Sequence, residues 1–259
     1  MLFELKNISY KYPDGTLALA EVTMSIGGGE RVAILGANGS GKSSLLRLLN
    51  GLVFAASGSL QFEGSEITDA SLKAPKLRLE FRRRVGFVFQ NAEAQLFNAT
   101  AFEEVAFGPR QIGMNESDVA ERASETLRFL GIEHLADRSP FRLSGGEKRK
   151  VAIASVLSMN PDVILLDEPY LGLDPRSQSW LHRTLTQLQE VGKTTIVATH
   201  TLGIVRQVAD RAIVLDEDHR VAADGDATDV LANYPMLCRA NLVDDAAFAV
   251  VGEAPVNSL

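Results

Sequence analysis

The feature that most restricts the fold of this chain is a glycine-rich octapeptide between a short apolar run and an amphipathic run. Residues 31–35 before it have strand character, and residues 42–49 carry leucines at helical spacing. The octapeptide follows the pattern G-x-x-x-x-G-K-S, and its members are Gly36, Ala37, Asn38, Gly39, Ser40, Gly41, Lys42 and Ser43. A strand, a glycine-rich turn and a helix in this order are the context that a phosphate-binding loop requires. The pattern predicts an α/β fold of the P-loop NTPase class.

The residues of this loop suit a polyphosphate ligand. Small residues let successive backbone N–H groups point at phosphate oxygens, and the dipole of the following helix favours the same anion. Lys42 adds a positive charge for the β- and γ-phosphates, and Ser43 can ligate Mg²⁺. The next residue, Ser44, is a further candidate for nucleotide binding. A glycine-rich turn that only caps a helix is the alternative, and the flanking strand and helix disfavour it. We therefore expect a nucleotide polyphosphate and Mg²⁺ as ligands.

Two adjacent carboxylates end a second apolar run. Residues 163–166 are Val, Ile, Leu and Leu, and Asp167 and Glu168 follow directly. Successive side chains of a strand point to opposite sides, so one carboxylate can serve a metal ion and the other a water molecule. We expect Asp167 to hold Mg²⁺ through its hydration shell and Glu168 to polarise the water that attacks the γ-phosphate. Two exposed acids at a strand end are the alternative if the motif stands alone.

Composition narrows the possible partners. The 26 basic residues are outnumbered by 33 acidic ones, and the formal charge of −7 gives no general attraction to nucleic acid. A single cysteine, Cys238, excludes an intramolecular disulfide and fits a reducing cytosol. No apolar run reaches the roughly 18 residues of a membrane span. A membrane role would therefore require docking to an integral partner.

The remaining pattern predicts a mostly parallel sheet with an antiparallel β layer at the N-terminus and an inserted α-helical subdomain. Apolar residues at helical spacing in 99–107 and 116–130 predict the helical insertion. A Gly/Ser-rich link is expected near residues 57–59. Strands are expected at 2–8, 19–26, 31–35, 85–89, 163–166, 194–198 and 212–215.

These elements predict a single domain over residues 1–243. Its nucleotide-binding core is expected at 1–90 and 159–230, and its helical subdomain at 91–158. The last stretch, 244–259, has no clear period and is expected to be a loosely held tail.

A third motif, Leu143-Ser144-Gly145-Gly146-Glu147, precedes a helical pattern and resembles the signature sequence of ABC ATPases. Two glycines at a helix start expose N–H groups that can close on a γ-phosphate. Ser144 with Glu147 three residues later is also a plain capping box, which needs no ligand. Taken together with the other two motifs, the sequence is similar to an ABC ATPase over about residues 2–230.

This resemblance implies roles for four further residues. Gln90 resembles the lid glutamine, which contacts nucleotide and Mg²⁺ and faces the membrane partner, and Asp174 resembles the D-loop aspartate. His200 resembles the switch histidine, which contacts the γ-phosphate, and Tyr12 resembles the aromatic residue on which adenine stacks. Taken singly, each has a structural alternative: a Gln at the core edge, a turn Asp, a His with its hydrogen bonds satisfied and a packed Tyr.

The resemblance also implies a dimer. In this family the signature segment of one subunit closes over nucleotide held by the loop of another, so Ser144, Gly145, Gly146 and Glu147 are assigned to the partner's nucleotide. The second ATPase subunit can be identical or paralogous. A monomer should bind ATP but hardly hydrolyse it.

Within the family, the segments Val85–Asn91, Gln95–Phe97 and Glu103–Pro109 resemble energy-coupling-factor importers of the cobalt and nickel type. The helix near residues 99–107 would then face a transmembrane coupling protein, with a small substrate-binding membrane protein beside it. This implies a peripheral ATPase at the cytoplasmic face of the cell membrane, which drives uptake of a transition-metal ion or a vitamin. The four histidines form no ligand cluster in the sequence, so the metal would be handled by the membrane partners.

Two alternatives remain open at this point. The chain could be the ATPase subunit of another ABC importer or exporter, since the ATP chemistry is the same. A soluble ABC ATPase that acts on DNA or ribosomes is a more distant alternative, because such proteins usually have coiled-coil insertions, tandem domains or basic surfaces.

Overall fold

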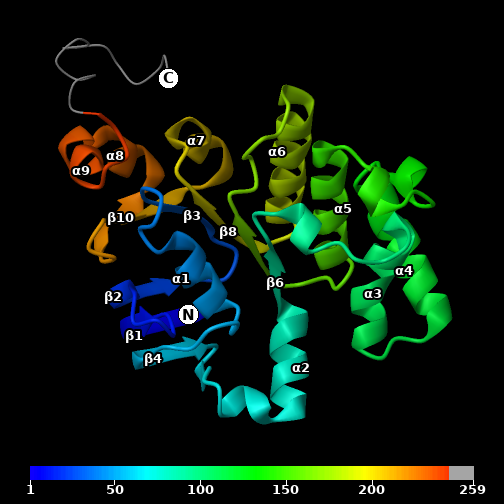
Figure 1. Ribbon diagram of the computed structural model, residues 1–259, viewed down its shortest axis with the longest axis horizontal. Helices are drawn as coiled ribbons and strands as arrows, with labels where there is room; N and C mark the ends of the chain where they lie inside the picture. Colours follow the sequence, from blue (N-terminus) through cyan, green and yellow to red (C-terminus); the bar gives the residue numbers. More distant parts are fainter. Residues whose placement is uncertain (245–259) are drawn as a thin grey trace. The chain divides into compact units, whose positions relative to one another are not determined.

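The structure, a computed structural model, describes residues 1–244 and divides into two compact units (Figure 1). The first unit comprises Met1–Lys73 together with the chain from Thr194 onward, and the second comprises Ala74–Lys193. Of the tail predicted at 244–259, residues 245–259 lie outside the described residues. The predicted limits of the core and helical subdomain stay a prediction.

The first unit opens with an antiparallel sheet of order β2-β1-β4-β5. Its strands are β1 (Phe3–Lys11), β2 (Leu17–Ile26), β4 (Ser57–Phe62) and β5 (Ser65–Glu66). The early antiparallel pair was predicted, but the link expected near residues 57–59 is wrong, because these residues begin β4. Ser57, Gly58 and Ser59 have little intrinsic preference for a strand. Pairing with β1, where Leu5 lies opposite Leu60, makes them one.

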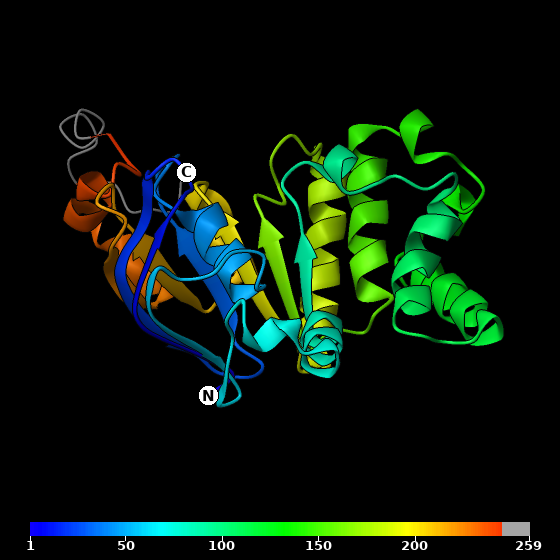
Figure 2. The same ribbon diagram turned by 60° about the horizontal axis from the view of Figure 1, so that its bottom comes forward.

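The second sheet of this unit is built around β3, which pairs in parallel with β8 and β9. Its strands are β3 (Arg31–Leu35), β8 (Thr194–Thr199), β9 (Arg211–Leu215) and the antiparallel β10 (Val221–Asp226). Helix α1 (Lys42–Leu49) contacts both β2 and β8, so it lies between the two sheets (Figure 2). The helices α7 (Val205–Val208), α8 (Ala227–Ala232) and α9 (Tyr234–Arg239) complete the unit. The mostly parallel core strands and the first helix are confirmed.

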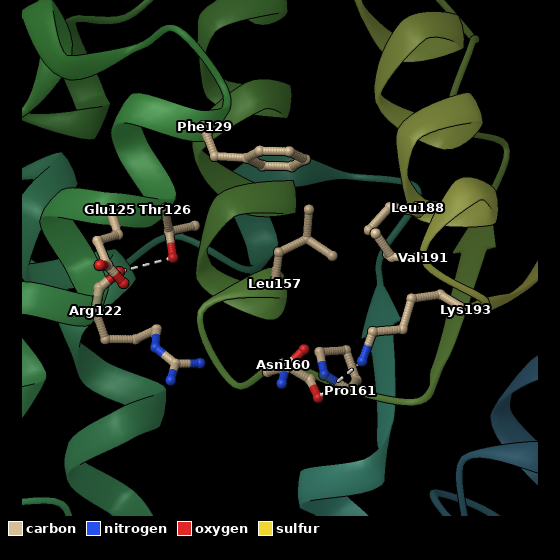
Figure 3. Close-up of a pocket in the computed structure, with 10 residues that line it drawn as sticks. All are labelled: Arg122, Glu125, Thr126, Phe129, Leu157, Asn160, Pro161, Leu188, Val191 and Lys193. Atoms are coloured by element: carbon tan, nitrogen blue, oxygen red, sulfur yellow. Dashed lines mark hydrogen bonds between the residues drawn. The ribbon is translucent and has the colours of Figure 1, made fainter.

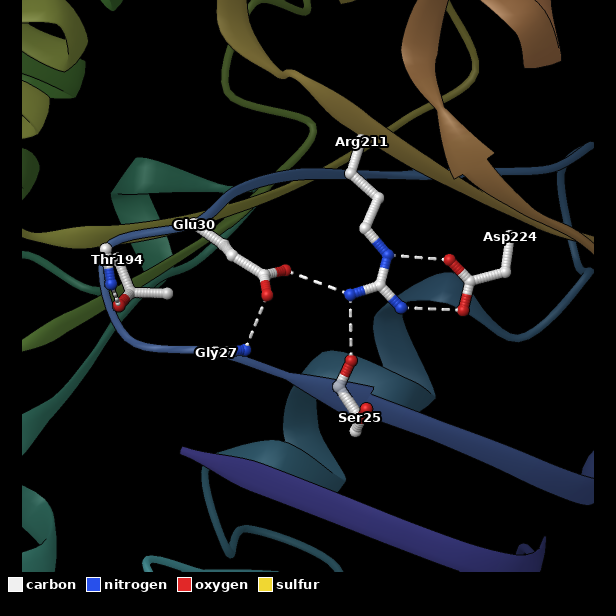
Figure 4. Close-up of polar contacts among 7 residues, drawn as sticks. Ser25, Gly27, Glu30, Thr194, Arg211 and Asp224 are labelled. Carbon is white, nitrogen blue, oxygen red and sulfur yellow. Dashed lines mark hydrogen bonds and ion pairs between the residues drawn. The ribbon is translucent and has the colours of Figure 1, made fainter. Parts of the chain in front are cut away.

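A polar network around Arg211 ties the two sheets of this unit together (Figure 4). Its guanidinium donates two hydrogen bonds of 2.7 Å to Asp224 and one of 2.9 Å to Glu30. A fourth bond, of 2.9 Å, goes to the carbonyl of Ser25 in β2, while Glu30 also accepts from Gly27 N at 2.9 Å. These partners, Asp224 first, hold the pKa of Arg211 above its usual value. The guanidinium therefore joins β9, β10 and the end of β2.

Arg211→Met is expected to lower the free energy of unfolding by about 2 kcal/mol, because four acceptors lose a charged donor that is only partly exposed. Thermal or urea unfolding measures the loss. Arg220→Met is the matched control, since Arg220 lies on the same hairpin and its ion pair with Glu21 is exposed. Exposed ion pairs contribute little. Equal losses in the two variants would contradict the role given to Arg211.

The second unit joins a parallel strand pair to a group of helices. The strands are β6 (Val85–Val88) and β7 (Val163–Asp167), and the helices are α2 (Pro75–Arg84), α3 (Ala101–Gln111), α4 (Glu116–Phe129), α5 (Gly145–Leu157) and α6 (Pro175–Glu190). Helices α3, α4 and α5 enclose a core that includes Val105, Val119 and Val151, all fully buried (Figure 1). This confirms the predicted helical insertion. Helix α2 was not predicted, because it buries only Phe81 and shows no apolar period.

Each of four helices begins at a side chain that accepts a hydrogen bond from its first turn. These residues are Thr100, Asn115, Ser144 and Asp174.

Among the described residues, no helix combines the length and the apolar character that crossing a bilayer requires.

Candidate functional site

The glycine-rich loop runs from the end of β3 to the start of α1, as the sequence predicts. Gly39 and Gly41 have φ angles of 87° and 106°, in the left-handed region that favours glycine. A Cβ atom at Gly41 would lie 2.1 Å from the carbonyl oxygen of Ala18. The loop therefore approaches β2 as closely as only glycine allows.

Two side chains of the loop are arranged to meet an anion. Lys42 is buried, and its Nζ donates to the carbonyls of Gly36 (2.8 Å) and Ala37 (2.9 Å), which holds the ammonium over the loop. The hydroxyl of Ser40 is buried without a hydrogen-bond partner in the described structure. Buried hydroxyls ordinarily have a partner. A phosphate oxygen at this loop would supply it, so these residues fit a bound polyphosphate.

Two residues from other segments reach the loop or the helix that follows it. Tyr12, the predicted adenine-stacking residue, makes a 2.7 Å hydrogen bond between its hydroxyl and that of Ser44. This places Tyr12 against α1, beside the loop. His219, which the sequence analysis missed, lies with its Nδ1 3.2 Å from the carbonyl of Ser40. Nothing in the local pattern marks it, because it reaches the loop from the β9–β10 hairpin.

His200 follows the carboxyl end of β8. Because Leu35 of β3 is paired with Thr199 of β8, the loop and His200 both leave the sheet at the ends of neighbouring strands. In open parallel sheets, ligands bind at this edge. The first unit thus brings together the loop and the predicted switch histidine.

The second unit repeats this arrangement with the other half of the predicted site. Val88 of β6 is paired with Leu166 of β7, so Gln90 and the two carboxylates follow neighbouring strand ends. Asp167 is 2% exposed and Glu168 is 6% exposed. The alternative of two exposed acids at a strand end is therefore wrong.

Glu168 also has an unusual backbone. Its φ is 44°, in the left-handed region, which costs a residue with a side chain roughly 1–2 kcal/mol. Such conformations concentrate at functional sites, where the surrounding structure holds them. Here the turn directs the chain away from β7 immediately after Asp167.

The capping box, one of the two interpretations of the signature motif, is present at the start of α5. Ser144 N donates to Glu147 Oε2 at 2.8 Å, and Ser144 Oγ accepts from Glu147 N at 3.4 Å. The bonds from Ser144 are the main cause that lowers the pKa of Glu147. Gly146 has a second constraint, since a Cβ atom there would lie 2.6 Å from Ser177 Oγ.

That contact brings the start of α6 against the start of α5. Asp174 accepts hydrogen bonds from Arg176 N (2.9 Å) and Ser177 N (3.1 Å), and Ser177 Oγ donates to it at 2.7 Å. These bonds, those from Ser177 first, lower the pKa of Asp174. The predicted D-loop aspartate and the signature glycines therefore meet at two helix N-termini.

A cavity of about 300 Å³ lies elsewhere in the second unit, among α4, α5 and α6 (Figure 3). The ring of Phe129 lies at one end of it, and Asn160 and Pro161 lie at the other. No predicted site residue lines this cavity, and we assign it no part in nucleotide binding.

Comparison with known proteins agrees with the fold and the motifs. Residues 19–171 match the ABC transporter family. The chain is 45% identical to a nickel import ATP-binding protein, LarO of Lactiplantibacillus plantarum, over 86% of its own length and 92% of that protein. It is 40% identical to the energy-coupling factor transporter ATP-binding protein EcfA of Methanothermobacter thermautotrophicus, over 93% of this chain and 76% of that one.

Among solved structures, cbiO1 from Clostridium perfringens, described as part of the ABC transporter complex cbiONQ, is similar throughout. It has a TM-score of 0.79 and 36% sequence identity, and the alignment covers 96% of this chain and 98% of cbiO1. The fold, the glycine-rich loop, the carboxylates at the strand end and the family match all agree with this similarity. The chain therefore belongs to the ABC transporter family, as one of its ATP-binding, ATP-hydrolysing subunits.

Proposed function

We propose that the residues at the two strand edges carry the ATP chemistry. The phosphates lie on the loop N–H groups and Lys42, with Tyr12 against adenine. Glu168 accepts a proton from the attacking water, and His200 orients that water and the γ-phosphate. The observation that carries this proposal is that each pair of predicted site segments leaves neighbouring parallel strands at their carboxyl ends.

Ser43, Gln90 and Asp167 would hold Mg²⁺. When bound, Mg²⁺ neutralises charge on the β- and γ-phosphates. The hydroxyl, amide and carboxylate oxygens of these residues are the hard ligands that Mg²⁺ prefers. The signature residues from Ser144 to Glu147 would close over nucleotide on a second ATPase subunit, which completes each site.

We further propose that the chain powers an importer of the energy-coupling-factor type that takes up a transition-metal ion, nickel or cobalt, with a vitamin as the next substrate class. The similarity to EcfA and to the nickel import protein LarO supports this proposal. The subunit would act at the cytoplasmic face of the membrane, bound to a transmembrane coupling protein and a substrate-binding membrane protein.

The surface for the coupling protein would include an exposed aromatic pair after the lid glutamine. Phe97 and Phe107 are 60% and 38% exposed, and their rings meet edge to face with centroids 4.9 Å apart. Two other apolar residues of α3 are less available for docking, since Val105 is fully buried and Phe102 packs against the helical core. Val105 therefore belongs to the core, and the exposure of Phe107 supports it as the proposed contact residue on α3.

Glu104 holds this pair in place. Its carboxylate is 3% exposed and accepts hydrogen bonds from Phe97 N, Asn98 N and, at 3.0 Å, Asn98 Nδ2. One buried charge thus fixes the loop that carries Phe97. The sequence analysis missed Glu104, because its neighbour Glu103 offers the same side chain one position earlier.

Glu104→Ala is expected to lower the free energy of unfolding by about 2–4 kcal/mol, because three donors lose a charged acceptor. The variant should also recover less membrane partner in affinity purification, since Phe97 loses its support. Glu103→Ala is the matched control and should do neither, as Glu103 is 42% exposed and pairs with Arg110. Unchanged stability of Glu104→Ala in thermal unfolding would contradict the role of Glu104 in holding the loop of Phe97.

The proposed function is tested by affinity purification of the tagged chain from its own membranes, followed by mass spectrometry. Recovery of a coupling protein with a small multi-pass metal- or vitamin-binding protein supports the importer. A different permease keeps the ATPase and overturns the subgroup. A ribosomal or DNA-bound partner overturns transport altogether.

A further inference from the structure

The segment that carries the lid glutamine is fastened to the signature helix α5 by side chains. We call residues 89–95, between β6 and α3, the lid segment. Arg149, on the second turn of α5, donates from Nη1 to the carbonyl of Phe89 at 2.7 Å and from Nη2 to that of Gln90 at 2.6 Å. The guanidinium thus bridges two consecutive backbone carbonyls at the lid glutamine.

A second side chain makes the same connection in the opposite direction. Gln95, in the lid segment, donates from Nε2 to the carbonyl of Ala152 (2.8 Å) and to Ser155 Oγ (3.1 Å). Its Oε1 accepts from Phe89 N at 3.2 Å. Since positions 149, 152 and 155 are three residues apart, these contacts follow one face of α5. An ion pair between Lys148 and Glu93 lies beside them.

The burial of Arg149 indicates that its bonds hold strongly. The residue is 6% exposed, and burial lowers the pKa of its guanidinium while the charge of Asp167 raises it. A buried charge is tolerated only when it is paired and hydrogen-bonded. The planar fork of arginine can serve two carbonyls at once, whereas the point charge of lysine has no such fixed geometry. Releasing the lid segment would leave this charge without two of its acceptors.

We infer that Arg149 is a positioning residue for Gln90, and that it makes the lid segment and the signature helix move as one body. The backbone of the residue that contacts the subunit's own nucleotide is then fixed to the helix that contacts the partner's nucleotide. This inference rests on the proposed roles of Gln90 and of the signature residues. It adds a side chain to which neither the motifs nor the family pattern quoted above assigns a role.

A double-mutant cycle on ATP hydrolysis tests the inference, with the complex purified from its own membranes through the tagged chain. Arg149→Met removes both donors and the charge, and Gln90→Ala removes the amide that Arg149 is inferred to position. Each single variant is expected to lower kcat about tenfold. If Arg149 acts through Gln90, the double variant should also be about tenfold slower than the parent, because coupled residues are not additive.

Three comparisons make the cycle decisive. A double variant about 100-fold slower than the parent overturns the inference alone, since independent effects multiply. A Gln90→Ala variant with the parent rate overturns both the role given to Gln90 and the inference. Lys150→Met, the neighbouring loss of charge on α5, contacts Trp180 and should leave kcat unchanged. Where Arg149→Met does not fold, Arg149→Lys replaces it and should show a smaller loss with the same coupling.

Discussion

Replacement of Glu168 by glutamine is expected to lower the rate of ATP hydrolysis by about 10²–10⁴-fold, the usual contribution of a general base. The amide keeps the size of the side chain but accepts no proton from water. ATP binding should survive, because the phosphate cradle belongs to the loop around Lys42. Nucleotide then stays between two subunits, so a dimer with trapped ATP should accumulate. Steady-state phosphate release and size-exclusion chromatography with MgATP measure the two effects.

The matched control for this variant is Glu63→Gln. Glu63 has a φ of 48°, close to the 44° of Glu168, but it is exposed and lies in the turn between β4 and β5. The same chemical change at a similar backbone conformation should therefore leave hydrolysis unchanged. A Glu168→Gln variant with the parent turnover would refute the role of Glu168 as the base.

Gly41→Ala is expected to weaken ATP binding by at least about 100-fold, which corresponds to about 2.7 kcal/mol. The new Cβ would lie 2.1 Å from the carbonyl of Ala18, a distance that real Cβ atoms do not show, so the loop must shift. The shift displaces the N–H groups that cradle the phosphates, and it also strains a φ of 106°. Isothermal titration with ATP gives the affinity.

Gly64→Ala separates the two causes. Gly64 has a φ of 78°, but a Cβ atom there would meet nothing within 4 Å, and the residue lies outside the site. It should lose stability through its backbone conformation alone and bind ATP as the parent does. Equal affinities in Gly41→Ala and the parent would show that the close approach to β2 is not needed for the cradle.

The two predictions separate ATP binding from ATP turnover. Gly41 is expected to act on binding through the shape of the backbone, whereas Glu168 is expected to act on turnover through the chemistry of its carboxylate. A variant of the first kind should abolish the nucleotide-dependent dimer, and a variant of the second kind should increase it.

The nucleotide-binding loop, the carboxylates at the end of a buried strand and the family could all be predicted from the sequence. These features are local: a glycine that needs positive φ, a strand of apolar residues and the polar residues at its end lie within a few positions of one another. The resemblance to ABC ATPases then identified Gln90, Ser144 and His200 as candidates. Strong apolar periods also gave the parallel strands and the helices α3 and α4.

The side chains that support those residues could be recognised only in the folded chain. The contacts of Arg149 with Phe89 and Gln90 join positions about 60 residues apart in sequence, and no local period records them. Glu104 and Glu103 are indistinguishable in sequence. In the fold Glu104 is buried and holds the loop of Phe97, whereas Glu103 lies at the surface. The strand β4 likewise forms because its backbone pairs with that of β1. Packing and hydrogen bonding between distant segments fix such roles, since the energy of a contact depends on what the whole fold brings beside it.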